Sequence, residues 1–326
     1  MASTQQVRFD VNDLPPPFTP ITLSIAAVER DTGLSKDTLR VWERRYGFPV
    51  PARDAAGERE YPLPQVEKLR AIKRLMDAGH RPGRIVPLPM SQLQLLTEQT
   101  LAQPQRGAAV ALDSDDLRAH LALIGRHDMV SLRGSLALLV AQVGVSRFVH
   151  EVVAPLNVAV GDAWLRGDLQ VFEEHLYTET VQSVLRQVIG SLPPASAATR
   201  PRVLLTTFPG ESHALGLLMA QAVLALDGCH CISLGTQTPI WDIVLASTGL
   251  SIDIVALSFT ACLNPNQVVD GLAEMRSKLP GAVDVWAGGS APVLHRRRVP
   301  GVQPMDTLQA AASALQAWRQ ARSPAT

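Results

Sequence analysis

The spacing of apolar residues changes along the chain and divides it into three folded parts. Residues 21–90 are charged and carry apolar positions at helical spacing, and residues 113–195 keep helical periodicity almost throughout. Over residues 200–326, short apolar runs alternate with helix-like stretches. This pattern predicts a compact helical head, a four-helix bundle and an α/β domain. The breaks between the four bundle helices are Gly125, Gly144 and Gly167.

The α/β prediction rests on four apolar runs that suit buried parallel strands, namely RVLLTTF, CHCISLG, IVALSF and VDVWAGG. Helix-like stretches such as ALGLLMAQAVLALDG separate them, so the expected fold of this part is a Rossmann-like sheet. Outside the folded parts, the proline-rich residues 1–20 are expected to form a flexible arm. The polar residues 91–112 are expected to form a linker.

The overall composition narrows the class of protein. The 326 residues carry a formal net charge of zero, so binding to nucleic acid requires a local basic surface. No apolar run is long enough for a membrane span, and the N-terminal sequence has no signal-peptide pattern. Cys229, Cys231 and Cys262 lie in apolar stretches and are expected to be buried, reduced thiols. These features predict a soluble, cytoplasmic protein that makes no contact with a membrane.

The head contains a pattern typical of a helix-turn-helix. The stretch LSIAAVERDTGLSKDTLRVWERRYGF predicts two helices joined by a turn at Gly33, with Ser35 as the N-cap of the second helix. Leu39, Trp42 and Tyr46 form an apolar stripe on that second helix. Four basic residues lie off the stripe and are free for solvent or phosphate: Lys36, Arg40, Arg44 and Arg45.

A predicted hairpin follows the two helices. The stretch PVPARDAAGEREY places Arg53 and Arg59 on either side of Gly57, as in the wing of a winged helix-turn-helix. Residues 21–90 hold 13 Lys and Arg against nine Asp and Glu, which gives a net charge of +4. A local basic excess on such a motif favours duplex binding. On periodicity alone, a charged helical hairpin used for packing remains an equal alternative.

The head resembles the DNA-binding domain of the MerR family over about 70 residues. The resemblance lies in TLSIAAVERDTGLSKDTLRVWERRYG, GEREY and VEKLRAIKRLMDAGHRPGRI. It implies that Arg40 and its neighbours enter the major groove of double-stranded DNA. It also implies that Arg53, Arg59 and Tyr61 contact the DNA backbone from the wing. The C-terminal cysteine cluster of metal-sensing members is missing, so metal sensing is not expected.

The stretch GESHALG follows the first apolar run of the α/β part and opens a helix-like stretch. It therefore places His213 at the carboxyl end of a parallel strand, where α/β sheets bind ligands. An imidazole there can ligate a transition metal while Glu211 accepts its other N–H, with Ser258 as a further link. Gly216 allows a close approach to the helix. Taken alone, this pattern also fits an ordinary surface histidine.

The spacing of further motifs resembles the cobalamin-binding domain of methionine synthase and corrinoid-dependent mutases. In this family, Asp/Glu-x-His-x-x-Gly precedes a Ser-x-Leu/Thr motif and then a Gly-Gly pair. Here 41 residues separate Gly216 from Ser258-Phe259-Thr260, and another 27 lead to Gly288-Gly289. The resemblance implies that His213 is the lower ligand of cobalt. It also implies that the nucleotide tail of the corrinoid runs along Ser258 and the two glycines.

The bundle adds a second signature, in which Trp164 is followed after nine residues by Glu174 and His175. Before a cobalamin domain, this spacing resembles the CarH/LitR-type regulators, which are MerR-family, adenosylcobalamin-binding photoreceptors. The resemblance implies that Trp164 packs beside the adenosyl group and that Glu174 and His175 line its pocket. Well-known members carry a histidine directly after the tryptophan, whereas this chain has Leu165. The upper cobalt ligand after illumination therefore stays open between His175, water and release of the photoproduct.

The resemblance implies a cobalamin-dependent, light-responsive repressor rather than an enzyme. It would bind DNA in the dark as a homo-oligomer, between dimer and tetramer, that adenosylcobalamin stabilises. Two alternatives stay open. The first is a light-insensitive regulator of the same architecture that responds to cobalamin or to a partner. The second is a corrinoid carrier in methyl transfer.

Overall fold

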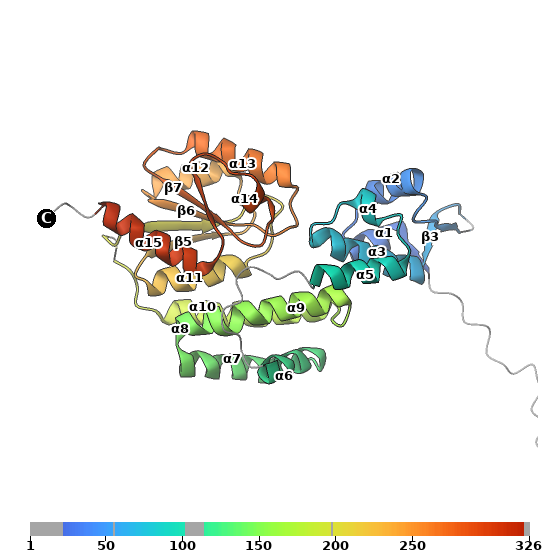
Figure 1. Cartoon of the computed structure of the whole chain (residues 1–326), viewed down its shortest axis with the longest axis horizontal. Helices are drawn as coiled ribbons and strands as arrows, with labels where there is room; N and C mark the ends of the chain where they lie inside the picture. Colours follow the sequence, from blue (N-terminus) through green and yellow to red (C-terminus); the bar gives the residue numbers. More distant parts are fainter. Residues whose placement is uncertain (1–21, 55, 102–113, 197, 323–326) are drawn as a thin grey trace, which may run out of the picture. The chain divides into compact units, whose positions relative to one another are not determined.

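The computed structural model describes residues 22–54, 56–101, 114–196 and 198–322. These residues form two compact units (Figure 1). The first contains the described residues up to Lys73 and Pro82–Met90, and the second contains Arg74–Arg81 and the residues from Ser91 onward. The predicted arm lies outside the described residues. None of the helices in the described part of the chain combines the length and apolar character that a bilayer-spanning helix needs.

The head has the predicted helix-turn-helix and wing. Gly33 adopts a left-handed conformation with φ of +69°, which ends the first helix, and the side chain of Ser35 accepts a hydrogen bond from the backbone N–H of Thr38 at 3.1 Å. The wing pairs Arg53 with Arg59 in an antiparallel register around Gly57. The head elements are β1 (Thr22–Ser24), α1 (Ile25–Thr32), α2 (Lys36–Tyr46), β2 (Ala52–Arg53), β3 (Arg59–Pro62), α3 (Leu63–Asp77) and α4 (Pro82–Ile85).

The first part of the predicted linker is helical. Helix α5 spans Met90–Leu101, and its Leu93 is completely buried. The stretch predicts a linker because it is rich in Gln, Thr and Ser, yet Leu93 and Leu96 lie one helical turn apart and can be covered on one face of a helix. The remainder of the predicted linker, residues 102–112, lies outside the described residues.

The bundle contains four helical segments whose breaks fall at the predicted glycines. Helix α6 ends at Gly125, and Gly144 and Gly167 cap the next breaks with φ of +78° and +86°. The third segment is not a regular α-helix, because a π-helical stretch (Phe148–Val153) lies between its two α-helical parts. The bundle elements are α6 (Ser114–Gly125), α7 (Met129–Val143), α8 (Val145–Arg147), η2 (Phe148–Val153), α9 (Ala154–Arg166) and α10 (Val171–Ser191).

The C-terminal part is a five-stranded parallel sheet in the order β5-β4-β6-β7-β8. The first four strands are the predicted ones, and the edge strand β8 was missed because Gln303 and Pro304 interrupt its apolar pattern. The strands are β4 (Arg202–Thr206), β5 (His230–Gly235), β6 (Ile254–Ser258), β7 (Asp284–Gly288) and β8 (Val302–Met305). The helices are α11 (Leu215–Leu226), α12 (Ile240–Gly249), α13 (Pro265–Lys278), α14 (Val293–Arg296) and α15 (Leu308–Arg322).

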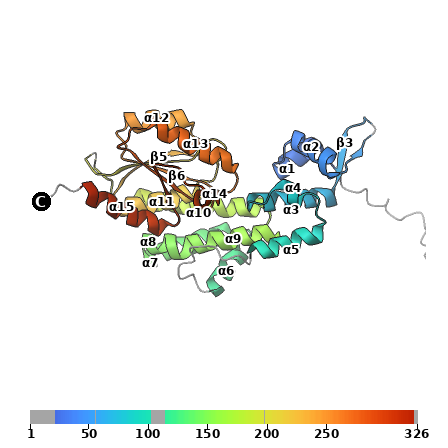
Figure 2. The ribbon, with the colours of Figure 1, turned by 45° about the horizontal axis from the view of Figure 1, so that its top comes forward.

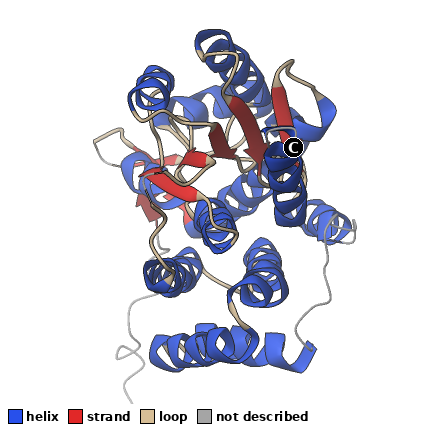
Figure 3. Ribbon diagram, turned by 90° about the vertical axis from the view of Figure 1, so that its left-hand side faces the viewer, coloured by secondary structure: helices blue, strands red, loops and turns tan. Residues whose placement is uncertain are grey.

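Helices cover both faces of this sheet (Figures 1 and 3). Helices α11 and α15 pack on one face, and α12 and α13 pack on the other. The bundle packs against α11 through a shared apolar core, in which Leu218, Met219, Ala222 and Val223 of α11 join residues of α7, η2, α9 and α10 (Figure 2). The bundle and the sheet are therefore parts of one compact unit, and α11 joins them.

Candidate functional site

The loops that follow β4 and β6 meet at the carboxyl edge of the sheet. These two strands are neighbours, but the chain leaves them in opposite directions, since β5 lies beyond β4 and β7 lies beyond β6. Such a reversal of strand order is where open α/β sheets bind ligands. Glu211 and His213 come from the first loop and Thr260 from the second, and the three side chains are joined by hydrogen bonds.

Glu211 is the centre of this group. Its side chain is completely buried, and its two carboxylate oxygens accept from different partners. Oε1 accepts from Nδ1 of His213 at 2.6 Å, while Oε2 accepts from the backbone N–H and the hydroxyl of Thr260 at 2.7 and 2.8 Å. Because every lone pair of the buried carboxylate has a donor nearby, its negative charge is stabilised without water.

His213 is oriented by Glu211 and remains accessible. Its Nδ1 donates to the carboxylate, which leaves Nε2 as the nitrogen available for a metal. The side chain of His213 is 57% exposed, so a ligand can approach that nitrogen. A histidine whose second nitrogen donates to a carboxylate is the usual arrangement of an imidazole metal ligand. The residues present therefore fit a group whose metal takes a histidine nitrogen as ligand, such as the cobalt of a corrinoid.

The hydrogen bonds also set the charges of the pair. Burial by itself raises the pKa of Glu211, but hydrogen bonds from His213, Thr260 and Cys262 outweigh it and lower that pKa to about 2. Hydrogen bonding to Cys262 and then to Glu211 raises the pKa of His213 to about 10. Without a metal, the imidazole is therefore protonated at neutral pH, and a metal that binds Nε2 has to displace a proton.

The motif residues around this pair have different roles from those expected. Thr260, not Ser258, is the hydrogen-bonding link to Glu211. Ser258 instead lies against Gly216, where a Cβ would come within 2.6 Å of the serine Oγ. The prediction of Ser258 as the link was wrong because Ser258 is the last residue of β6 and faces helix α11 at Gly216, whereas Thr260 lies in the loop beyond the strand and reaches Glu211. The close approach predicted for Gly216 is confirmed.

The two glycines after β7 are needed by the fold itself. Gly289 has φ of +108°, and a Cβ there would overlap the backbone carbonyl of Phe259. The backbone N–H of Phe259 donates to the carbonyl of Gly288 at 2.9 Å. The space beside Gly289 is thus filled by the loop after β6. That the nucleotide tail runs along Ser258, Gly288 and Gly289 stays a prediction.

Cys262 also belongs to the site, which its apolar sequence context does not indicate. We expected a buried thiol, but Cys262 is exposed because its loop has already left the apolar strand β6. Its Sγ lies 3.2 Å from Oε2 of Glu211. The sequence feature that could have indicated this role is the position of Cys262, two residues after Thr260. Cys229 is buried as expected, while Cys231 is only partly buried against the core beneath α11.

The bundle residues that the resemblance assigned to the upper face lie on α9 and at the start of α10. Trp164 and Leu165 are half-buried near the end of α9. Glu174 accepts hydrogen bonds from Nδ1 of His175 at 2.7 Å and from the hydroxyl of Thr178 at 2.6 Å. The side chain of His175 is 70% exposed. Helix α10 packs on α11, the helix that begins just after His213, but contact of these residues with a corrinoid stays a prediction.

Some of the predicted DNA-contact residues are exposed, whereas others are paired with side chains of the head or buried in it. Arg40, Arg44 and Arg45 are exposed on α2, and Arg53 is exposed on the wing. Lys36 is half-buried and lies 3.7 Å from Glu29, and Nε of Arg59 donates to Glu43 on α2 at 2.9 Å. Tyr61 is completely buried in the head core, so its assignment to the DNA backbone was wrong. Tyr61 lies in the short strand β3, whose residues do not alternate clearly between apolar and polar, so the sequence pattern does not reveal its burial.

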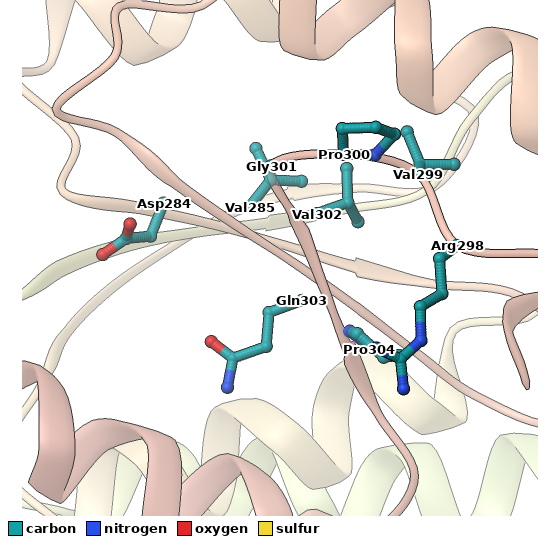
Figure 4. A pocket seen from close by; sticks show the side chains of 9 residues that line it. All are labelled: Asp284, Val285, Arg298, Val299, Pro300, Gly301, Val302, Gln303 and Pro304. Carbon is teal, nitrogen blue, oxygen red and sulfur yellow. The ribbon is translucent and has the colours of Figure 1, made fainter.

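A cavity of about 610 Å³ lies elsewhere on the sheet domain, beside β7 and β8 (Figure 4). Asp284, Arg298 and Gln303 are among its lining residues. Asp284 is the first residue of β7, so this cavity opens at the amino ends of the strands. His213 follows the carboxyl end of β4, at the opposite edge of the parallel sheet. The cavity is therefore not part of the group around Glu211.

Comparisons with known proteins find matches for both the head and the helical bundle. Residues 23–88 match the MerR HTH family regulatory protein description, and residues 109–189 match the B12 binding domain description. The chain is 31% identical over 272 residues to the HTH-type transcriptional repressor CarH of Myxococcus xanthus, covering 81% of this chain and 87% of that protein. It is 30% identical over 280 residues to the HTH-type transcriptional repressor CarA of the same organism, covering 83% and 88%.

Among solved structures, the fold resembles that of the monomethylamine corrinoid protein of Methanosarcina barkeri. The TM-score is 0.50 at 14% identity, and the match covers 61% of this chain and 96% of that protein. At this identity the likeness concerns the fold alone. It agrees with a helical bundle packed on a Rossmann-like parallel sheet.

Proposed function

The chain belongs to the CarH-type family of B12-binding MerR regulators, and we propose that it is a light-responsive repressor that binds its operator in the dark as an adenosylcobalamin-loaded homo-oligomer. The observation that carries this proposal is the pair of His213 and Glu211 at the carboxyl edge of the sheet. Its relatives named above are transcriptional repressors and not enzymes, so we assign it no catalytic reaction.

In this proposal, His213 is the lower ligand of cobalt through Nε2. Glu211 holds the imidazole in the tautomer that leaves Nε2 free, and Thr260 holds Glu211 through two hydrogen bonds. The bound adenosylcobalamin supplies a cobalt–carbon bond that visible light can break. The chain orients the cofactor and responds to the breaking of this bond, whereas the photochemistry itself belongs to the cofactor.

The bundle carries the proposed response. Trp164 provides an indole that packs beside the adenosyl group, and Glu174 and His175 provide polar contacts to it. Trp164 follows Ala163 on α9, and Ala163 belongs to the core that α9, α10 and α11 share, so a change in the packing of Trp164 can alter how the bundle sits on the sheet. Light therefore separates the oligomer by removing the contact of Trp164 with the adenosyl group, which only the dark arrangement makes.

Oligomerisation matters because one head is a weak DNA ligand. Its net charge is only +4, and the exposed arginines available on α2 are Arg40, Arg44 and Arg45. Linking two or more heads makes the second binding event intramolecular and raises the affinity by about 100-fold or more. Loss of the oligomer in the light then releases the operator without any change in the heads.

The test of this proposal is a comparison of the loaded protein before and after green light. We expect the adenosylcobalamin-loaded chain to elute as a dimer or larger and to retard operator DNA in the dark, and to lose both properties after illumination. His213→Ala should show neither property at the same cobalamin concentration. An unchanged size and unchanged DNA retardation after photolysis would eliminate the light-responsive function.

Leu165 favours one second candidate, a light-insensitive regulator with the same architecture. The leucine stands directly after Trp164 and has no atom that ligates cobalt. A chain of this kind would bind DNA in a cobalamin-dependent manner, and illumination would change its absorption spectrum but not its oligomeric state. The same experiment separates the two candidates, because only the first predicts loss of the oligomer.

A further inference from the structure

Three different metal-ligating side chains meet at the edge of the sheet. The donor atoms of Glu211, His213 and Cys262 all lie within 4.8 Å of one another. Nδ1 of His213 is 2.6 Å from one carboxylate oxygen of Glu211, and Sγ of Cys262 is 3.2 Å from the other. The light-regulation proposal uses the histidine and the glutamate but gives no role to the thiol.

The chemistry of this donor set is that of zinc. Imidazole nitrogen, thiolate sulfur and carboxylate oxygen are the protein ligands of Zn²⁺, and three of them leave the fourth tetrahedral position open for water. With ordinary zinc–ligand bond lengths, neighbouring ligand atoms lie roughly 3.4–3.6 Å apart. Sγ of Cys262 lies 3.2 Å from Oε2 of Glu211, close to this value, whereas Nδ1 of His213 lies 2.6 Å from the other oxygen, Oε1. The imidazole therefore has to shift for a single carboxylate oxygen to share an ion with both partners.

The surroundings allow this adjustment. His213 and Cys262 are exposed and can move, whereas Glu211 is buried and fixed by Thr260. A ligand that is itself held by hydrogen bonds from neighbouring groups is typical of protein metal sites. The fixed carboxylate can therefore act as the anchor, and the two exposed side chains close onto the ion from the solvent side.

We propose that the cobalamin-free protein binds one Zn²⁺ ion through Glu211, His213 and Cys262. The ion displaces the protons of the thiol and of the imidazole and takes a water molecule as its fourth ligand. Zinc on Nδ1 of His213 leaves the remaining proton of the imidazole on Nε2, the proposed cobalt ligand, so zinc and cobalamin exclude each other. The mutual exclusion of zinc and cobalamin rests on the proposed function, whereas the zinc site itself does not.

The test uses the full chain, free of cobalamin and metal and without an affinity tag, titrated with aqueous Co²⁺ as a spectroscopic substitute for zinc. We expect a thiolate-to-cobalt charge-transfer band in the near ultraviolet that saturates at one equivalent and disappears when Zn²⁺ is added. Cys262→Ser and His213→Ala should lose the band. Thr260→Val should keep it with an affinity about 10–100-fold lower, since Thr260 only holds the anchoring carboxylate.

The matched control is Cys231→Ser. The thiol of Cys231 packs near the core beneath α11, with the carbonyl of Gln221 as its hydrogen-bond acceptor at 4.0 Å. This variant should keep the band, and circular dichroism checks that all variants are folded. No band in the wild-type protein, or a band that survives in folded Cys262→Ser, would overturn the proposal.

Competition then separates this inference from the proposed function. One equivalent of Zn²⁺ should slow or weaken cobalamin loading of the wild-type protein but not of Cys262→Ser, which retains His213. If the wild-type protein takes up Co²⁺ but never cobalamin, the zinc site stands and the proposed function fails. If it takes up cobalamin normally but shows no charge-transfer band, the zinc site fails and the proposed function stands.

Discussion

At the scale of single residues, the site depends on two residues that differ in burial, Glu211 and His213. The carboxylate of Glu211 is completely buried and fully hydrogen-bonded, while the imidazole of His213 is more than half exposed. The buried partner keeps its charge because its donors replace water, and the exposed partner keeps one nitrogen free for a ligand. This division explains why the site needs both residues.

The raised pKa of His213 predicts how cobalamin binding depends on pH. A proton and cobalt compete for Nε2, so ligation is weakened wherever the free protein holds that proton. With a pKa of about 10, the affinity should rise with pH between 6.5 and 10, by up to about tenfold per pH unit. A histidine with its ordinary pKa would give no further rise above pH 6.5. Equilibrium titration of cobalamin at several pH values measures this slope.

Glu211→Gln is the control for the pH dependence of cobalamin affinity. An amide cannot stabilise the imidazolium as a carboxylate does, so the pKa of His213 should fall, and the rise in affinity with pH should end at a lower pH than in the wild-type protein. Calorimetry in buffers with different ionisation enthalpies should detect about one proton released per cobalamin bound by the wild-type protein near pH 7. Wild-type and variant proteins with the same slope would contradict the role assigned to the pair.

The sequence predicted part of this residue-scale picture. Glu211 and His213 occupy the expected loop and Gly216 the first turn of α11, because a motif with fixed spacing on one strand end determines their positions locally. The contacts of Thr260 and Cys262 with Glu211 depend on how two neighbouring strands are placed in register, which the sequence does not state. Tyr61 was misassigned for a related reason, since burial depends on three-dimensional neighbours.

At the scale of elements, the turn after β7 is the most constrained point near the site. Gly289→Ala should lower the free energy of unfolding by about 2–5 kcal/mol, because it combines a positive φ with an overlap against the backbone of Phe259. Backbone atoms cannot move aside as a flexible side chain can. Chemical denaturation of the cobalamin-free protein measures the change.

Gly281→Ala is the matched control for this turn. Gly281 is exposed in the loop before β7, and no atom lies within 4 Å of the position that its Cβ would take. Its substitution should change the free energy of unfolding by no more than about 0.5 kcal/mol. Equal stabilities of the two variants would show that the contact between Gly289 and Phe259 does not constrain the fold.

Helix α2 carries the prediction for DNA binding. Arg40 is exposed, with Asp37 as a nearby partner at 3.1 Å, so its guanidinium can be transferred to DNA at little cost. Arg40→Ala should weaken operator binding by about 1–3 kcal/mol if it contacts a base, and should reduce the salt slope by about 1 if it contacts a phosphate. Fluorescence anisotropy at several salt concentrations distinguishes the two cases.

Arg147→Ala is the charge-matched control, because Arg147 is an exposed arginine of the bundle that pairs with Glu151. It should bind the operator like the wild-type protein, and both variants should load cobalamin normally. Wild-type affinity and salt slope in Arg40→Ala would remove Arg40 from the DNA interface.

The elements were predictable where local signals are strong. Glycines end three bundle helices, and apolar runs mark the strands β4, β5, β6 and β7, so the sequence alone locates them. Helix α5 and strand β8 were missed because their polar residues and Pro304 weaken the local pattern, and tertiary contacts stabilise them instead. The π-helical turn at Phe148–Val153 has no sequence signal that we can identify.

At the scale of the whole molecule, the bundle and the sheet share one core although the sequence presents them as separate parts. Four residues of α11 belong to the bundle core, and the opposite side of the same helix covers the sheet. Helix α11 is apolar on nearly all sides, as expected for a helix packed on two faces. The sequence shows this apolar character, but it does not show which neighbour covers which face.

The proposed regulation depends on the bond between Nε2 of His213 and cobalt, and electron paramagnetic resonance measures that bond directly. The protein is loaded with cobalamin reduced to the cobalt(II) state, once with natural histidine and once with histidine labelled with ¹⁵N in the ring. We predict that the superhyperfine splitting from the axial nitrogen changes from a triplet to a doublet on labelling, and that His213→Ala shows no such change. A triplet that persists in the labelled wild-type protein would mean that the corrinoid keeps its own base as lower ligand, which would contradict the account.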